Sequence, residues 1–205
     1  MKLHTSIGPN PRVVKMFLAE KGLELPAVKV DLMAGENRQA PYNAQVNTAG
    51  QTPALELDDG SCVTEITAIC EYLEERQPSP PLIGTTAEER ATTRMWTRRA
   101  DLKVCEPMAN GFRYAEGLPL FESRLRCLPE AAPGLKLVAR DGLEWFEAQF
   151  KGPWIAGDRF TLADILLFSF LDFGGQVGQP LDPAFAKLTD WFGRVKERPS
   201  AAASA

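Results

Sequence analysis

The Thr52-Pro53 step constrains this chain more than any other feature, because a short apolar run follows it directly at residues 54–57. Proline cannot donate to a sheet ladder, so Pro53 is expected at the first position of a strand. A cis X-Pro bond would turn the backbone sharply at this point. The N–H and C=O of Thr52 would then be free to pair with an extended ligand, as an added strand does. The alternative is a proline that only starts a strand.

A hairpin and a helix start follow this step. Asp58-Asp59-Gly60 is a turn signal between residues 55–57 and 61–63, which predicts a hairpin. Glu65 then opens a helix, and the N–H groups and positive dipole end of a helix N-terminus can hold a carboxylate. A peptide-like, acidic small molecule fits such a place. An ordinary helix start is the alternative.

The segments before the hairpin indicate an α/β domain. Residues 2–5 resemble a short strand, Pro11 suits the first turn of a helix that Gly22 ends, and residues 26–31 form the next strand. Strands joined by one helix are expected to be parallel, with a right-handed crossover. Residues 35–39 are polar and read as a loop, and residues 41–46 as a short irregular helix. The first 76 residues therefore predict the order β-α-β-α-β-β-α.

Residues 77–86 form a proline-rich linker, after which the pattern contains helices only. We predict domains at residues 1–76 and 87–205, the second all-helical. Its long first helix should be interrupted at Pro107. Capping boxes are expected at Thr86–Glu89 and Thr161–Asp164, and the apolar run 165–171 predicts a buried core helix. Further helices are expected at 135–150 and 183–197, and a frayed tail at 201–205.

Composition excludes several classes of protein. The net charge of −4 argues against a general nucleic-acid binder. The four cysteines are scattered and the chain has one histidine, so we expect no metal site. No apolar run is long enough to span a membrane, and no signal peptide is recognisable, so we expect a cytoplasmic protein.

The loop before the first helix is a candidate for thiol chemistry. It places Ser6 and Asn10 near the helix N-terminus, where an anion is stabilised. Lowering the pKa of a bound thiol by about two units requires roughly 2.7 kcal/mol. The candidate donors are the Asn10 amide and the hydroxyls of Ser6 and Thr5. The alternative is that this loop only shapes the turn. In the helical domain, Asn110 and Arg113 are candidates for a substrate cleft, and a solvated or subunit-facing surface is the alternative.

Taken in order, these motifs resemble the bacterial cytosolic glutathione transferases. The resemblance rests on residues 51–55, residues 65–69, the linker and residues 160–165. It implies a thioredoxin-like first domain that binds glutathione as co-substrate, a cis bond at Pro53 and a homodimer. It also implies that Thr52 pairs with the cysteinyl main chain of glutathione, and that the Thr161–Asp164 box is structural.

The same resemblance implies further contacts to glutathione. Glu65 and Ile66 would hold the γ-glutamyl carboxylate and amine, and Gln51 would lie near the glycyl end. We include Arg38 among the candidate glutathione-binding residues.

The chain departs from the family pattern at the loop that faces the sulfur. Many members carry Tyr, Ser or Cys there, and the tyrosine and cysteine of the beta class correspond to Thr5 and Asn10 here. The loop is closer to members with a Thr-Pro-Asn loop, some of which reduce disulfides with glutathione. We expect an enzyme that transfers glutathione to an electrophile. The alternatives are a glutathione-dependent disulfide reductase or peroxidase, and a non-catalytic protein that binds glutathione or a partner.

Overall fold

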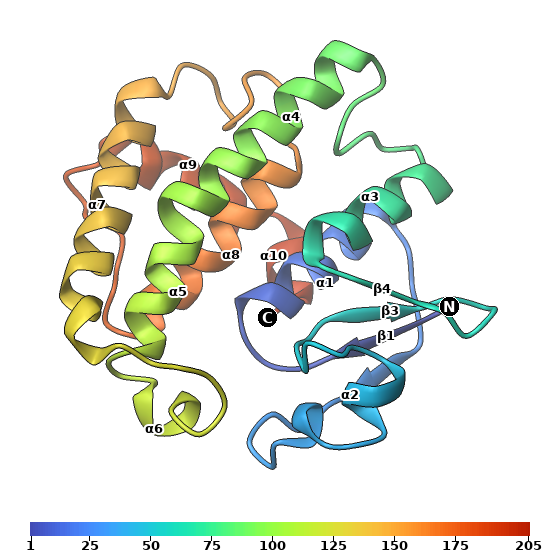
Figure 1. The fold of residues 1–205 in the computed structure, drawn as a ribbon. Coiled ribbons are helices and arrows are strands. Elements are labelled where there is room, and N and C mark those ends of the chain that lie inside the picture. Colours follow the sequence, from blue (N-terminus) through green and yellow to red (C-terminus); the bar gives the residue numbers. More distant parts are fainter. The chain divides into compact units, whose positions relative to one another are not determined.

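The chain divides into two compact units in the computed structural model, which describes residues 1–205. The first unit comprises residues 1–81 together with residues 202–205, and the second comprises residues 82–201. The division falls between Pro81 and Leu82, inside the proline-rich segment. The first unit holds a four-stranded sheet, whereas the second holds helices but no strand (Figure 1).

The sheet has the strand order β2-β1-β3-β4. Its strands are β1 (Lys2–Thr5), β2 (Ala27–Lys29), β3 (Ala54–Glu56) and β4 (Cys62–Thr64). β1 and β2 are parallel, as expected for strands joined by one helix, and the other two pairs are antiparallel. The predicted hairpin is therefore confirmed, and the second strand is shorter than the predicted range of 26–31.

Helices cover both faces of this sheet. α1 (Pro9–Lys21) and α3 (Ile66–Arg76) pack side by side (Figure 1) and bury apolar side chains at helical spacing. Side chains alternate along a strand, so Leu3 lies on the face opposite His4. The ring of Tyr42, from α2 (Tyr42–Gln45), packs edge-on against His4 with the centroids 6.0 Å apart. The segment predicted as a loop at 35–39 contains one 3₁₀ turn, η1 (Glu36–Arg38).

A buried ion pair joins α1 to α3. Lys21 Nζ contacts the carboxylate of Glu74, and both side chains are almost fully buried. Lys21 Nζ also donates to the carbonyls of Gln77 (2.8 Å) and Pro80 (2.6 Å). One lysine therefore satisfies a buried carboxylate and fixes the chain that leaves α3.

The expectation of a frayed C-terminal tail is wrong. α10 (Pro199–Ala203) is helical, and Ala201 and Ser204 are only 3% and 0% exposed. Lys15 Nζ of α1 lies 3.5 Å from the carbonyl oxygen of Ala205, within the first unit. Residues 202–205 therefore belong to the first unit although they lie far from it in the sequence, which composition alone does not reveal.

The second unit is built around α8 (Leu162–Gln176). Every residue from Leu162 to Leu171 is buried, which confirms the prediction of a core helix. The other elements are α4 (Ala87–Ala100), η2 (Asp101–Cys105), α5 (Glu106–Arg113), α6 (Leu118–Phe121), η3 (Pro129–Ala131), α7 (Ala132–Gln149) and α9 (Ala186–Lys196). The sequence did not predict α6 or η3.

The long helix is interrupted next to Pro107, as predicted. The turn η2 is π-helical, and Pro107 lies at the start of α5. Proline cannot bond to the carbonyl four residues earlier, which is that of Lys103. α7 approaches this carbonyl at Gly142, where a Cβ atom would lie 2.2 Å from it. Glycine therefore permits the close packing of α7 on the interrupted turn.

Asp164 connects three segments of the second unit. Its Oδ2 accepts from the Thr161 N–H at 2.9 Å, which completes the predicted capping box. Its Oδ1 accepts from the Ile155 N–H and from Trp191 Nε1, each at 2.8 Å. Burial raises the pKa of Asp164 to about 6, although these hydrogen bonds oppose the rise. At Thr86 only half of the predicted box forms, because Glu89 Oε2 accepts from Thr85 (2.7 Å).

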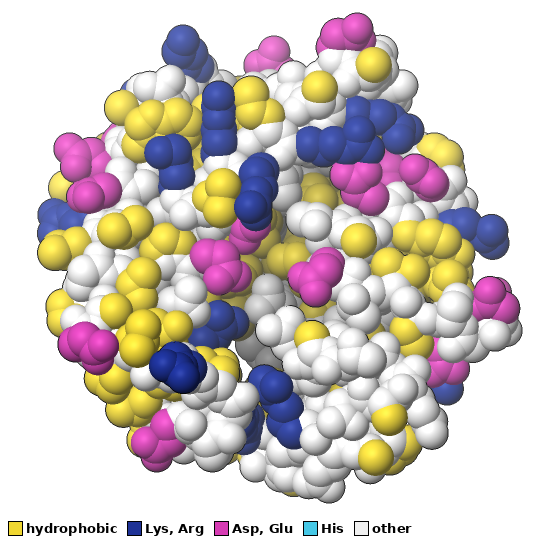
Figure 2. All heavy atoms as spheres, viewed as in Figure 1, with side chains coloured by type: hydrophobic (Ala, Val, Ile, Leu, Met, Phe, Trp, Pro, Cys, Tyr) yellow, Lys and Arg dark blue, Asp and Glu magenta, His cyan; other side chains and the backbone are white.

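None of the helices combines the length and the apolar character that a bilayer-spanning helix needs. No group of three or more His, Cys, Asp and Glu side chains is arranged to hold a metal ion. All four cysteines are free, and only Cys70 and Cys105 are buried. Acidic and basic side chains are interspersed on the face shown in Figure 2.

Candidate functional site

The register of the sheet brings three chain segments together at one end of the first unit. Ala54 of β3 lies opposite the third residue of β1 and opposite the last residue of β4. The antiparallel β1–β3 register continued by two residues places Thr52 opposite Ser6, and β4 ends at Thr64, two residues before α3 begins at Ile66. Ser6 Oγ does lie 2.5 Å from Thr52 Oγ1. The end of β1, the start of β3 and the start of α3 therefore meet here.

The main chain of Thr52 is available to a ligand. The Thr52-Pro53 bond is cis, which confirms the prediction made from the sequence. The N–H and C=O of Thr52 form no hydrogen bond within the chain, and Thr52 is half-buried. At a half-buried position, backbone groups without a partner in the chain bond to solvent or to a ligand. They mark this position as one that an extended ligand would complete.

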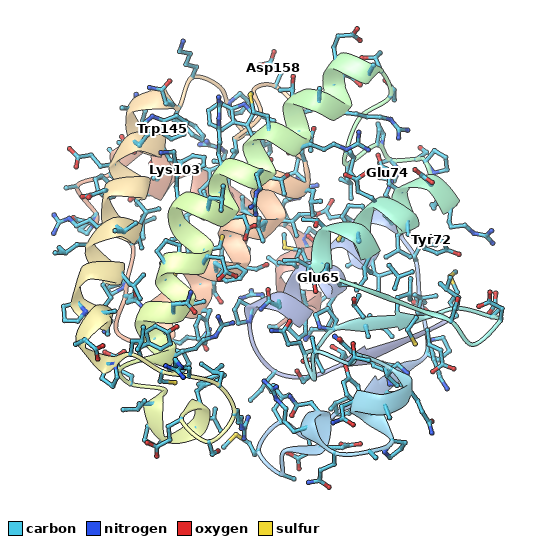
Figure 3. All side chains as sticks on the ribbon, viewed as in Figure 1. Glu65, Tyr72, Glu74, Lys103, Trp145 and Asp158 are labelled. Atoms are coloured by element: carbon cyan, nitrogen blue, oxygen red, sulfur yellow. The ribbon has the colours of Figure 1, made fainter.

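Glu65, the residue that precedes α3, has a strained backbone conformation. Its φ is 68° and its ψ is 123°, and it is the only residue other than glycine with a positive φ. Such conformations are costly for side chains other than glycine and cluster at functional sites. Glu65 is exposed and lies at the start of α3 (Figure 3). No side chain caps this helix, so the N–H groups of its first turn, beginning with Ile66, remain open to an anion.

The first turn of α1 contains an unusual set of donors. The helix begins Pro9-Asn10-Pro11, and no side chain caps it. Proline has no N–H, so Asn10 is the only one of these three positions that can donate from its backbone. The Asn10 side chain also makes no hydrogen bond within the chain. Asn10 therefore offers its backbone N–H and its amide group at the positive end of the helix.

Ser6 is differently placed from Asn10. Its hydroxyl donates to the carbonyl of Ile7 at 3.1 Å and also contacts the Thr52 hydroxyl. A hydroxyl carries a single hydrogen, so in this arrangement Ser6 has none left for a sulfur atom. The Thr5 hydroxyl is buried and has no partner. The geometry gives Ser6 an anchoring contact to Thr52 and leaves Asn10 as the accessible donor, because the Thr5 hydroxyl is covered.

Arg38 lies against the loop that precedes Gln51. Its guanidinium donates to the Ala49 carbonyl at 3.3 Å. Gly50 has a φ of 60°, and a Cβ atom there would lie 2.9 Å from Arg38 Cδ. Gln51 and Arg38 are both exposed, so their polar ends are accessible beside Thr52.

Asn110 and Arg113 belong to the second unit, on α5. The Arg113 guanidinium donates to Asn110 Oδ1 at 2.9 Å and lies 5.9 Å from the centroid of the Phe121 ring. The sequence thus identified two side chains that contact each other. Their surroundings are aromatic, since Phe112 packs edge-on against Phe121 and Phe173.

Sequence reasoning missed the side chains that hold the loop before Thr52. Asn37 Nδ2 donates to the Gly50 carbonyl at 2.5 Å. Tyr42 and Asn47 both donate to the carbonyl of Gln51, at 2.7 and 2.9 Å. All three side chains are buried. The available signal was the group of asparagines just before Gly50, because asparagine side chains commonly bond to nearby backbone in turns.

A sheet that ends in a cis-proline loop with unpaired backbone, followed by a helical unit, defines the thioredoxin-like, two-unit fold of the glutathione transferases. The chain matches the family model described as "Glutathione S-transferase, N-terminal domain" over residues 7–76. It matches "Glutathione S-transferase, C-terminal domain" over residues 129–199. The chain belongs to the glutathione S-transferase family.

Named relatives agree with this assignment. "Glutathione S-transferase 2" of Saccharomyces cerevisiae is 32% identical over 201 residues, which cover 96% of this chain and 85% of that protein. The maleylacetoacetate isomerase of Pseudomonas aeruginosa is 42% identical over 199 residues, covering 93% and 90%. Among solved structures, Gtt2 from Saccharomyces cerevisiae has a TM-score of 0.92 and 31% identity, with 100% of each chain covered.

Proposed function

We propose that this protein is an enzyme that binds glutathione on its first unit and transfers it to an electrophilic small molecule. The observation that carries the proposal is the unpaired main chain of Thr52, which lies next to the uncapped start of α3. Free backbone groups at the end of a sheet suit an extended, peptide-like ligand. Family membership supplies glutathione as the expected ligand.

The proposed binding mode uses both ends of the peptide. Thr52 pairs with the cysteinyl main chain of glutathione. The carboxylate of Glu65 holds the γ-glutamyl amine, and the N–H of Ile66 binds the γ-glutamyl carboxylate at the helix N-terminus. Gln51 and Arg38 lie toward the glycyl carboxylate, where the guanidinium supplies a positive charge.

Asn10 is the proposed activating residue. Its two donors stabilise the thiolate, and the thiol proton leaves to solvent. The sulfur lone pair then forms a bond to the electrophilic carbon, and the leaving group departs with its bonding electrons. Ser6 acts by holding Thr52 in place. Asn110 and Arg113 are proposed contacts to the second substrate, and a homodimer is the proposed assembly.

A second candidate reaction is reduction of a disulfide or peroxide, begun by attack of the same thiolate and completed by a second glutathione, so that the two leave as glutathione disulfide. It is favoured by a loop around Asn10 that contains neither tyrosine nor cysteine. The similarity to a maleylacetoacetate isomerase adds isomerisation to the reactions worth testing, in which a thiolate would add and later leave. Binding of glutathione without turnover in any of these assays would instead indicate a binding protein.

The test compares Glu65→Gln with Glu75→Gln, an exposed glutamate on the same helix. Glutathione affinity is measured by calorimetry, and turnover is measured with an activated aryl halide and with a mixed disulfide. Loss of the negative charge that attracts the γ-glutamyl amine should weaken binding about tenfold or more in Glu65→Gln. Glu75→Gln should bind like the parent. Equal affinity in both variants would show that this binding mode is wrong.

A further inference from the structure

Two buried side chains donate hydrogen bonds to the carbonyl of Gln51. Tyr42 Oη donates to it at 2.7 Å, and Asn47 Nδ2 donates to it at 2.9 Å. Tyr42 is 5% exposed and Asn47 is 6% exposed. Two donors from buried groups on one carbonyl oxygen leave it little freedom to reorient.

The peptide bond after this carbonyl is trans, because the only cis bond in this loop follows Thr52. In a planar trans peptide the C=O and the next N–H point in opposite directions. Gln51 C=O and Thr52 N–H belong to the same peptide plane. Since the carbonyl is directed toward Tyr42 and Asn47, the Thr52 N–H is directed away from them, where it has no partner.

The side chains that hold this carbonyl are themselves fixed. The Tyr42 ring packs edge-on against His4 of β1, with the centroids 6.0 Å apart. Burial raises the pKa of Tyr42 to about 12, so its hydroxyl keeps its proton and remains a donor. Asn47 Oδ1 accepts from the Ala49 N–H at 3.0 Å, which orients the amide so that Nδ2 faces Gln51. The adjacent Gly50 carbonyl is held by Asn37.

We infer that Tyr42 and Asn47 are positioning residues for glutathione: by fixing the Gln51–Thr52 peptide plane they aim the Thr52 N–H at the ligand. The inference rests on the proposed function, in which that N–H pairs with the cysteinyl main chain. Neither side chain touches the ligand. Their effect is on glutathione affinity, because a peptide plane that is already oriented loses less freedom on binding.

Each of two variants removes one of the two donors. Tyr42→Phe keeps the ring that packs on His4. Asn47→Asp keeps the oxygen that accepts from Ala49, and it replaces the Nδ2 donor by a carboxylate oxygen that repels the Gln51 carbonyl. Tyr72→Phe is the matched control, because the Tyr72 hydroxyl on α3 makes no hydrogen bond (its position is labelled in Figure 3).

The experiment measures KM for glutathione, kcat at saturating glutathione, and hydrogen exchange of the Thr52 amide with and without glutathione. Tyr42→Phe should raise KM about two- to tenfold, and the double variant with Asn47→Asp should raise it further. In both, kcat should stay within about twofold of the parent value. Protection of the Thr52 amide by glutathione should fall in parallel with affinity, while Tyr72→Phe matches the parent.

Two results would overturn the inference, and they are distinguishable. If glutathione protects the Thr52 amide equally in the parent and both variants and KM is unchanged, the inference is wrong while the proposed function stands. If glutathione does not bind the parent or leaves its Thr52 amide unprotected, the proposed function fails and the inference fails with it. Should the double variant unfold, Tyr42→Phe alone decides, because it removes a single hydroxyl.

Discussion

Replacing Asn10 by alanine removes the side-chain amide at the first turn of α1 while keeping the backbone N–H of that position. Pro9 and Pro11 on either side cannot donate, so the amide is one of few groups able to bond a sulfur there. A hydrogen bond to a charged acceptor contributes about 1.5–3 kcal/mol. At 1.36 kcal/mol per pKa unit, Asn10→Ala should raise the pKa of bound glutathione thiol by about one to two units.

The rate should follow the thiolate population. If the bound thiol has a pKa near 6.5 in the parent and near 8 in the variant, the thiolate fraction at pH 7 falls roughly fivefold to tenfold. Turnover with an electrophile at pH 7 should fall by the same factor and recover at higher pH. Asn10→Asp should raise the thiol pKa further, because a carboxylate repels the thiolate.

The assay is the ultraviolet difference spectrum of glutathione bound to the protein, titrated against pH. Asn43→Ala is the matched control, since the Asn43 amide donates to a backbone carbonyl at 2.9 Å. The thiol pKa should be lowest, and equal, in the parent and Asn43→Ala, higher in Asn10→Ala and highest in Asn10→Asp. An unchanged thiol pKa in Asn10→Ala would refute the activation scheme.

Two predictions concern stability, both measured by urea unfolding. Asp164 has a folded pKa of about 6 against 3.8 for the ordinary side chain, so the folded state binds its proton more tightly. The parent protein should therefore lose up to about 3 kcal/mol of unfolding free energy, relative to Asp164→Asn, as the pH rises from 4 to above 6. A difference between the two proteins that does not change with pH would contradict this. Lys21→Met should cost about 3–5 kcal/mol, because it removes the buried ion pair with Glu74 and the hydrogen bonds to the carbonyls of Gln77 and Pro80. A loss below about 1 kcal/mol would show that the pair contributes little to stability.

Local patterns in the sequence were sufficient for most of the architecture. Helical periodicity, the turn at Gly60 and the proline at 107 act through residues a few positions apart, so they can be recognised without coordinates. The Thr161–Asp164 box is equally local, and it forms as predicted. A proline at a strand start also indicated the cis bond of Pro53, which the structure confirms.

The candidate site was only partly predictable. Ser6 and Asn10 were equivalent as donors in the sequence, and the structure separates them because the Ser6 hydroxyl is engaged by Ile7 and Thr52. The prediction of a frayed tail failed because residues 202–205 join the first unit, whose other residues lie far away in the sequence.

The sequence by itself determined the order of elements, the family resemblance and the Thr52-Pro53 step on which a ligand is expected to pair. Only the tertiary structure decided which donors remain available and which groups orient Thr52. Tyr42 reaches Gln51 nine residues away, and Trp191 reaches Asp164 twenty-seven residues away. Hydrogen bonds at such separations depend on how the chain packs, and periodicity and propensity carry no information about that.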